Sequence, residues 1–115
     1  MQNHKKLLVW QKADELAFKV YKVTERFPKS ELLGITSQLR RSALSVPVNI
    51  VEGYGRRSNA ELSRFIDISL GSLAECEYLL EFSERLGYLT HDEAIHLYEL
   101  TTEVSKILWK FKQSL

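Results

Sequence analysis

Apolar residues recur at steps of three and four along nearly the whole chain, and this spacing constrains the fold more than any other feature of the sequence. It is the period of one face of an α-helix, so long stretches of it predict amphipathic helices. Pro28, Gly53, Gly55 and Gly87 interrupt the pattern with residues that end helices. The four predicted helices cover about residues 8–27, 33–54, 58–86 and 90–113.

The starts of the last two predicted helices carry a capping signal. Ser58–Glu61 and Thr90–Glu93 each place a hydroxyl at the N-cap and a glutamate three residues later. In such a capping box each side chain accepts a hydrogen bond from the other residue's backbone N–H. Inside the second predicted helix, Pro47 removes one backbone hydrogen bond and crowds the carbonyl of Ala43. Because the apolar stripe continues in phase to Ile50, we expect a kink at Pro47 rather than a break.

Four long helices with short connections favour an all-α fold, an antiparallel up-down-up-down four-helix bundle. The 115 residues suit a single domain, residues 1–115, with a core large enough to need no staples. The one cysteine, Cys76, excludes an internal disulfide and a cysteine-based zinc site. Since Cys76 falls in the apolar stripe of its helix, we expect a buried, unreactive thiol.

The chain has more apolar surface than one stripe per helix requires. The additional residues are Trp10, Ala17 and Tyr21, then Phe65, Ile68, Leu79, Phe82 and Leu86, and finally Tyr98 and Trp109. Large exposed apolar patches are rare on monomers. Either the core face of each helix is broad, or the chain associates with itself, and we favour self-association.

Charge is unevenly distributed along the sequence. The chain has 16 Lys and Arg against 15 Asp and Glu, a net charge of +1 that does not by itself indicate a strongly basic nucleic-acid binder. Residues 1–29 carry +4 and residues 34–58 carry +3, whereas residues 59–99 carry −7. Either the two signs meet within or between subunits, or the basic half stays exposed and binds a polyanion.

The candidate nucleic-acid-binding residues are basic; one lies on the first predicted helix and two pairs bracket the second: Lys12, Arg40, Arg41, Arg56 and Arg57. Arginine suits phosphate because its planar fork makes two parallel hydrogen bonds. Arg40 and Arg41 diverge by about 100° on a helix, so at most one of them points with the core. A structural role is the alternative, for example an ion pair between Arg56 and Glu52. Tyr54 is the one aromatic residue near these arginines in sequence, so RNA binding would rest on shape and phosphate rather than on base stacking.

Polar residues also line one side of the second predicted helix. Ser45, Asn49 and Glu52 are spaced by four and three, and Gln38 belongs to the same class. A hydrolase would need a base, and no histidine is near in sequence. We therefore expect a buried or interfacial hydrogen-bond network that fixes register.

No pattern in the sequence supports catalysis. The Glu-x-x-His pair Glu93–His96, which di-iron bundles carry on two helices, occurs once here. Gly53-Tyr54-Gly55 follows a helix and lacks the remainder of a nucleotide-binding fingerprint. We expect a non-catalytic protein with no metal and no cofactor.

The beginning of the chain is polar, and the apolar run after it stops at four residues, short of the roughly 7–15 of a secretory leader. No stretch approaches the roughly 18–20 apolar residues of a membrane span. We therefore expect a cytoplasmic protein with no membrane partner.

An ordered set of short segments spans most of the chain: Val9–Ala13, Phe27–Pro28, Gln38–Ser42, Asn49–Arg56, Gly71–Glu75 and Leu86–Leu89. The set resembles the four-helix-bundle proteins named after the intervening sequences of bacterial 23S rRNA genes, often called small-subunit ribosomal proteins. The resemblance implies an up-down bundle that assembles into a ring, a homopentamer in known relatives. Such a ring fits the surplus apolar surface, and we expect Trp10 and Tyr54 to make structural or interface contacts. It implies no cellular role, because the function of most members is unknown.

A related branch is the accessory protein of diversity-generating retroelements, which binds nucleic acid and a reverse transcriptase. Those proteins are similar in architecture but strongly basic, whereas this chain carries +1. The sequence favours a homo-oligomer that binds structured RNA or another nucleic acid. The alternatives are a protein-interaction scaffold whose arginines serve subunit assembly, and an accessory protein of a reverse transcriptase.

Overall fold

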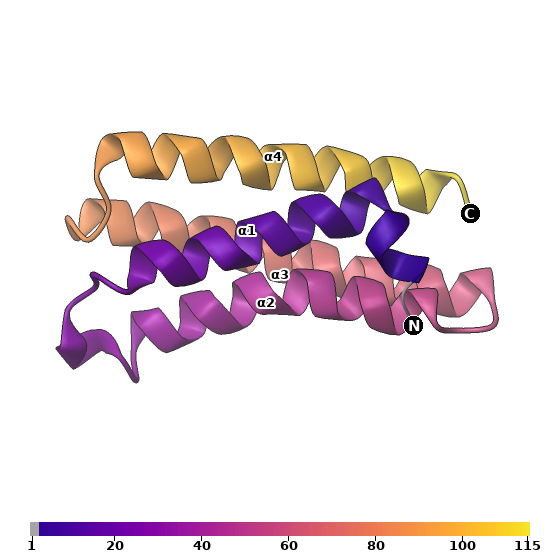
Figure 1. Cartoon of the computed structure of the whole chain (residues 1–115), viewed down its shortest axis with the longest axis horizontal. Coiled ribbons are helices and arrows are strands. Elements are labelled where there is room, and N and C mark those ends of the chain that lie inside the picture. The colour runs from indigo at the N-terminus through magenta and orange to yellow at the C-terminus, as the bar shows by residue number, and fades with distance from the viewer. Residues whose placement is uncertain (1–2) are drawn as a thin grey trace.

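The computed structural model describes residues 3–115, which form four α-helices joined by short connections (Figure 1). The helices are α1 (Leu8–Thr24), α2 (Ile35–Tyr54), α3 (Asn59–Arg85) and α4 (His91–Gln113). Single 3-10 turns, Asn3–Lys6 and Lys29–Glu31, precede α1 and α2. The predicted all-α fold is confirmed, and no described helix is long and apolar enough to cross a membrane.

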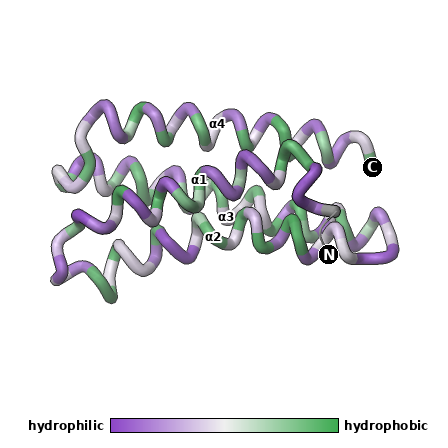
Figure 2. Tube along the Cα trace, viewed as in Figure 1, coloured by the Kyte–Doolittle hydropathy of each residue, from purple (hydrophilic) through white to green (hydrophobic). Residues whose placement is uncertain are grey.

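The four helices pack as an up-down-up-down bundle of 43 × 24 × 21 Å. Each helix packs on the next, and α4 packs back on α1, so the bundle closes on itself. Hydrophobic and hydrophilic segments alternate along every helix in Figure 2, as expected of amphipathic helices that share one core. The largest fully buried side chains come from all four helices: Leu16, Leu39, Ile50, Ile66, Leu80, Leu97 and Leu108.

The helix ends follow the predicted signals with two exceptions. Thr90 and Glu93 form the complete capping box, with hydrogen bonds of 3.1 and 2.9 Å. At α3 half of the box forms: the Glu61 backbone N–H donates to the Ser58 hydroxyl. The Glu61 carboxylate accepts a hydrogen bond from that hydroxyl instead of from the backbone N–H of Ser58. α1 ends at Thr24, three residues before the predicted end, although the turn that follows still buries Phe27.

Gly87 ends α3 through backbone geometry that an L side chain rarely adopts. Its φ is +81°, in the left-handed region that favours glycine. The N–H of Tyr88 donates to the carbonyl of Ser83 at 3.0 Å, and that of Gly87 donates to Glu84 at 2.9 Å. This pair of bonds is a Schellman motif, which satisfies carbonyls that the helix end would leave free.

α2 continues through Pro47 to Tyr54, so the predicted absence of a break is confirmed. The kink stays a prediction. Near the end of α2, Gly53 packs tightly on α3: a Cβ there would lie 2.7 Å from the Cβ of Phe65. Glycine thus allows the two helices to approach closely where the chain turns from one into the other.

The surplus apolar residues divide between core and surface. Ala17 and Leu79 are buried and belong to the core, which the broad-face interpretation predicts. Other surplus residues stay exposed: Tyr21, Ile68, Leu86 and Trp109. Phe18, Leu44, Val48 and Tyr78 are also exposed, and sequence spacing did not single them out. Self-association stays a prediction.

Candidate nucleic-acid interface

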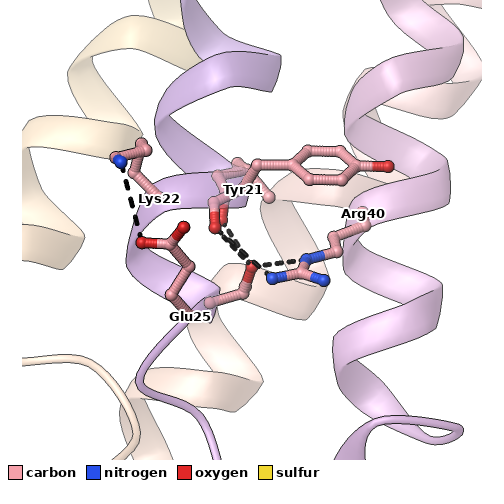
Figure 3. Close-up of polar contacts among 6 residues, drawn as sticks. Tyr21, Lys22, Glu25 and Arg40 are labelled. Atoms are coloured by element: carbon pink, nitrogen blue, oxygen red, sulfur yellow. Dashed lines mark hydrogen bonds and ion pairs between the residues drawn. The ribbon is translucent and has the colours of Figure 1, made fainter.

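Arg40 is half-buried and contacts the end of α1 (Figure 3). From α2 its Nε donates to the Thr24 hydroxyl at 2.7 Å, and a terminal nitrogen reaches the Tyr21 carbonyl at 3.5 Å. The guanidinium also lies 4.9 Å from the centre of the Tyr21 ring. The Thr24 hydroxyl itself donates to the Val20 and Tyr21 carbonyls, at 2.8 and 3.0 Å. Arg40 thus joins α2 to the C-terminal end of α1, where a cation is favoured.

Arg41 has a different environment from its neighbour. It is exposed and borders a polar cleft of about 390 Å³ between α2 and α3, with Gln38 and Glu75 on the same cleft. Its guanidinium makes no hydrogen bond or ion pair with residues 3–115. The prediction that at most one of the two arginines points with the core agrees with these positions.

The predicted polar network on α2 forms in part. Asn49 donates to the carbonyl and the hydroxyl of Ser45, at 2.8 and 2.9 Å. The Ser45 hydroxyl in turn lies 2.8 Å from that of Ser72 on α3. Glu52 lies outside this network and pairs with Arg56 at 3.4 Å. The network therefore joins α2 to α3 within one bundle.

The remaining predicted basic residues lie on two separate surfaces. Lys12 lies between α1 and α4, 3.5 Å from Glu103 and 3.9 Å from Glu15. Arg56 lies over the Phe65 ring at 4.8 Å, as well as pairing with Glu52 as the structural alternative predicted. Arg57 is exposed in the turn between α2 and α3 and has no hydrogen-bond or ion-pair partner among the described residues.

The two aromatic candidates differ in burial. Trp10 is half-buried against the core and meets the His4 ring edge to face, with centroids 4.9 Å apart. Tyr54 is exposed where α2 ends. Trp10 therefore contributes to the packing of this bundle, and Tyr54 leaves its ring on the surface.

Basic residues gather at one end of the bundle, the end that holds the first described residues, the α2–α3 turn and the C-terminus (Figure 1). Residues 3–8, 52–67 and 106–115 together hold eight Lys and Arg against three Asp and Glu, a net charge of +5. We call this region the basic end. Six of its basic side chains are exposed and have no acidic partner among residues 3–115: Lys5, Lys6, Arg57, Arg64, Lys106 and Lys110.

The opposite end of the bundle is acidic. Residues 24–34 and 78–93 hold six Asp and Glu against three Lys and Arg, a net charge of −3. Here the Glu84 carboxylate accepts hydrogen bonds from Tyr98 at 2.8 Å and His91 at 2.9 Å. The bond from His91, with that from Tyr98, lowers the pKa of Glu84 below its usual value. Charge is thus polarised along the length of the molecule.

The cysteine and the Glu-x-x-His glutamate both have structural roles. Cys76 is fully buried, as predicted, and burial raises the pKa of its thiol to about 12. Glu93 caps α4 and pairs with Arg26 of the α1–α2 connection. Within residues 3–115, no three His, Cys, Asp or Glu side chains converge as metal ligands.

These features define the class of protein: an all-α, up-down four-helix bundle with one basic and one acidic end. The chain matches the family model for the 23S rRNA-intervening sequence protein over residues 5–110, and it belongs to that family. The resemblance read from the sequence is therefore confirmed.

The fold is also similar to a crystal structure of a protein of unknown function from the S23 ribosomal protein family of Bacteroides thetaiotaomicron VPI-5482. The two share 25% identity with a TM-score of 0.85, over 92% of this chain and 96% of that one. No curated protein matches the chain.

Proposed function

We propose that this protein is a non-catalytic homo-oligomer that binds nucleic acid through its basic end. The observation that carries the proposal is a set of six exposed basic side chains that three distant segments bring to one end of the bundle. None of the six has an acidic partner among residues 3–115. Lys and Arg that neutralise phosphates release counterions, which favours binding at low salt. Arg57 and Lys106 are members of this set, whereas Arg40 is bound to the end of α1.

Self-association is the second part of the proposal. Tyr21 lies against Arg40, and Leu44 and Val48 follow Arg40 at successive turns of α2. All three apolar side chains are exposed and form what we call the α1–α2 strip. A ring of five subunits, as the resemblance implies, would cover this strip.

The binding test measures affinity for structured RNA and duplex DNA at about 50 and 200 mM salt. We expect binding that weakens steeply with salt. The double variant Arg57→Gln/Lys106→Gln should lower the slope of log affinity against log salt by about two units for duplex DNA. Each removed charge is exposed and unpartnered within residues 3–115, so the bundle should remain folded.

A matched control removes the same charge from the acidic end, in Lys29→Gln/Arg85→Gln, two exposed residues with no acidic partner among residues 3–115. We expect its affinity and salt slope to stay close to those of the unchanged protein. An equal loss in both double variants would contradict a localised site. If the protein binds neither RNA nor DNA even at low salt, the arginines would serve subunit assembly, which favours the protein-interaction scaffold.

A further inference from the structure

The last turns of α4 carry two lysines beside two grooves. Lys106 and Lys110 are exposed and lie one turn apart on the outer side of the helix. On the α3 side, Trp109 and Ser105 line a groove of about 270 Å³ together with Leu70 and Ala74. On the α1 side, Ile107 and Phe111 line a mainly apolar groove of about 390 Å³. The helical period places Lys106 between these grooves and Lys110 at the rim of the apolar groove, which it helps to line.

Trp109 is the most unusual residue of this region. Half of its surface is exposed, although tryptophan is usually well buried. The Lys112 ammonium lies 5.2 Å from the centre of the indole and pairs with Asp67 of α3 at 2.6 Å. An exposed aromatic ring beside lysines is the arrangement that proteins use to stack bases of single strands.

We infer that this part of the basic end binds single-stranded nucleic acid, with phosphates on Lys106 and Lys110 and a base stacked on Trp109. The inference rests on the proposed function and names the form of nucleic acid that the site would take. A duplex keeps its base faces stacked, so only an unpaired base can offer one to the indole. The sequence alone does not indicate such stacking, because Tyr54 is the one aromatic residue near the candidate arginines in sequence.

The size of the groove fits one planar base. Its volume of about 270 Å³ is below the roughly 300–1,000 Å³ of small-molecule pockets. The acidic member of the lining, Glu77, accepts a hydrogen bond from Thr101 at 3.1 Å. Thr101 is eight residues before Trp109, about 12 Å along the helix, so this carboxylate lies away from the indole. Around Trp109 the basic side chains outnumber the acidic ones: Lys106, Lys110 and Lys112 against Asp67 and Glu77. This excess of positive charge favours a polyanion.

Fluorescence tests this contact directly. The chain has two tryptophans, so Trp10→Phe leaves Trp109 as the single indole reporter. We would titrate this variant with oligothymidylate of about 12 nucleotides, a usual site size, and with a duplex of the same length. We expect the single strand to quench Trp109 and the duplex to leave its emission unchanged.

Substitution of the indole supplies the second measurement. Trp109→Leu keeps an apolar side chain and should weaken single-strand binding by about tenfold, the loss typical of one stacked base. Duplex binding should stay as it was, and Trp109→Phe should retain most of the single-strand affinity.

Four results would overturn the inference. Unchanged single-strand affinity in Trp109→Leu would remove the stacking contact while leaving phosphate binding intact. Equal losses for both nucleic acids would show that Trp109 supports the whole site rather than stacking an unpaired base. A lower assembly mass in Trp109→Leu, with unchanged single-strand binding, would assign the indole to a subunit contact. If neither nucleic acid binds at low salt, the proposed function fails as well.

Discussion

At the scale of single residues, two neighbouring arginines have opposite roles. Arg40 contacts the end of α1 and stacks on Tyr21, whereas Arg41 faces solvent at the polar cleft. Their angular separation was predictable from helix geometry. The partner of Arg40 was not, because it depends on where α1 ends and on which helix packs beside it. Arg40 reaches the Thr24 hydroxyl because α2 packs beside the last turn of α1, a contact between residues 16 positions apart.

The prediction at this scale compares the two arginines. Arg40→Ala should destabilise the bundle by about 1–3 kcal/mol, because the Thr24 hydroxyl and the Tyr21 carbonyl lose a charged donor. Arg41→Ala should change stability by no more than about 0.5 kcal/mol. Urea unfolding measures both values. Equal losses in the two variants would mean that the Arg40 contacts contribute little to stability.

At the scale of helices, most of the fold was predictable and the details of contact were not. Apolar spacing, Pro28, Gly87 and the Thr90–Glu93 box are local signals, and each marks a helix or its end. For the hydrogen-bond network between α2 and α3, the sequence predicts only that one side of α2 is polar. The Ser45–Ser72 contact that completes it joins residues 27 positions apart, which spacing along one helix does not reveal.

Glu84 supports a prediction about pH for the α3–α4 pair. Its pKa is lowered in the folded state by His91 and Tyr98, so the folded state holds this proton less tightly than the unfolded state. The stability that ionised Glu84 adds to the folded state is fully present above pH 4.5, which is the ordinary pKa of the carboxyl group. It is lost as the pH falls from there through the lower pKa of the folded state.

Thermal melts between about pH 7 and pH 3 measure this effect. Glu84→Gln should reduce the fall in Tm over the acid range. Glu81→Gln is the matched control, since Glu81 is an exposed residue on the same helix with no ion pair in the described part of the chain. Parallel curves for Glu84→Gln and the unchanged protein would show that Glu84 is not a source of acid sensitivity.

At the scale of the whole molecule, charge is arranged by topology rather than by sequence order. The sequence divides into a basic first half and an acidic third helix, but the bundle sorts charge into two ends. Lys5, Arg57 and Lys110 meet because antiparallel helices return the chain to the same end. The concentration of basic residues at one end was not predicted, because a count of charges along the sequence averages over the two ends of each helix.

The prediction at this scale concerns assembly. Light scattering should give a mass that is a multiple of 13.4 kDa, near five subunits. Leu44→Lys places a charge in the exposed α1–α2 strip and should lower that mass. Ile95→Lys, on the exposed side of α4, is the control and should not. A monomeric unchanged protein, or equal effects of both substitutions, would contradict the strip as an interface.

The concentration of positive charge at one end has a consequence for avidity. Closed rotational symmetry repeats every surface feature identically in each subunit, so a ring would present as many basic ends as it has subunits, all with the same tilt. A long polyanion bound at one such end is held at high effective concentration near the next. Contacts that are individually weak and short-lived then add up, and release requires all of them to open together. Affinity would consequently grow with the length of the bound strand while the chemistry of each contact stayed the same.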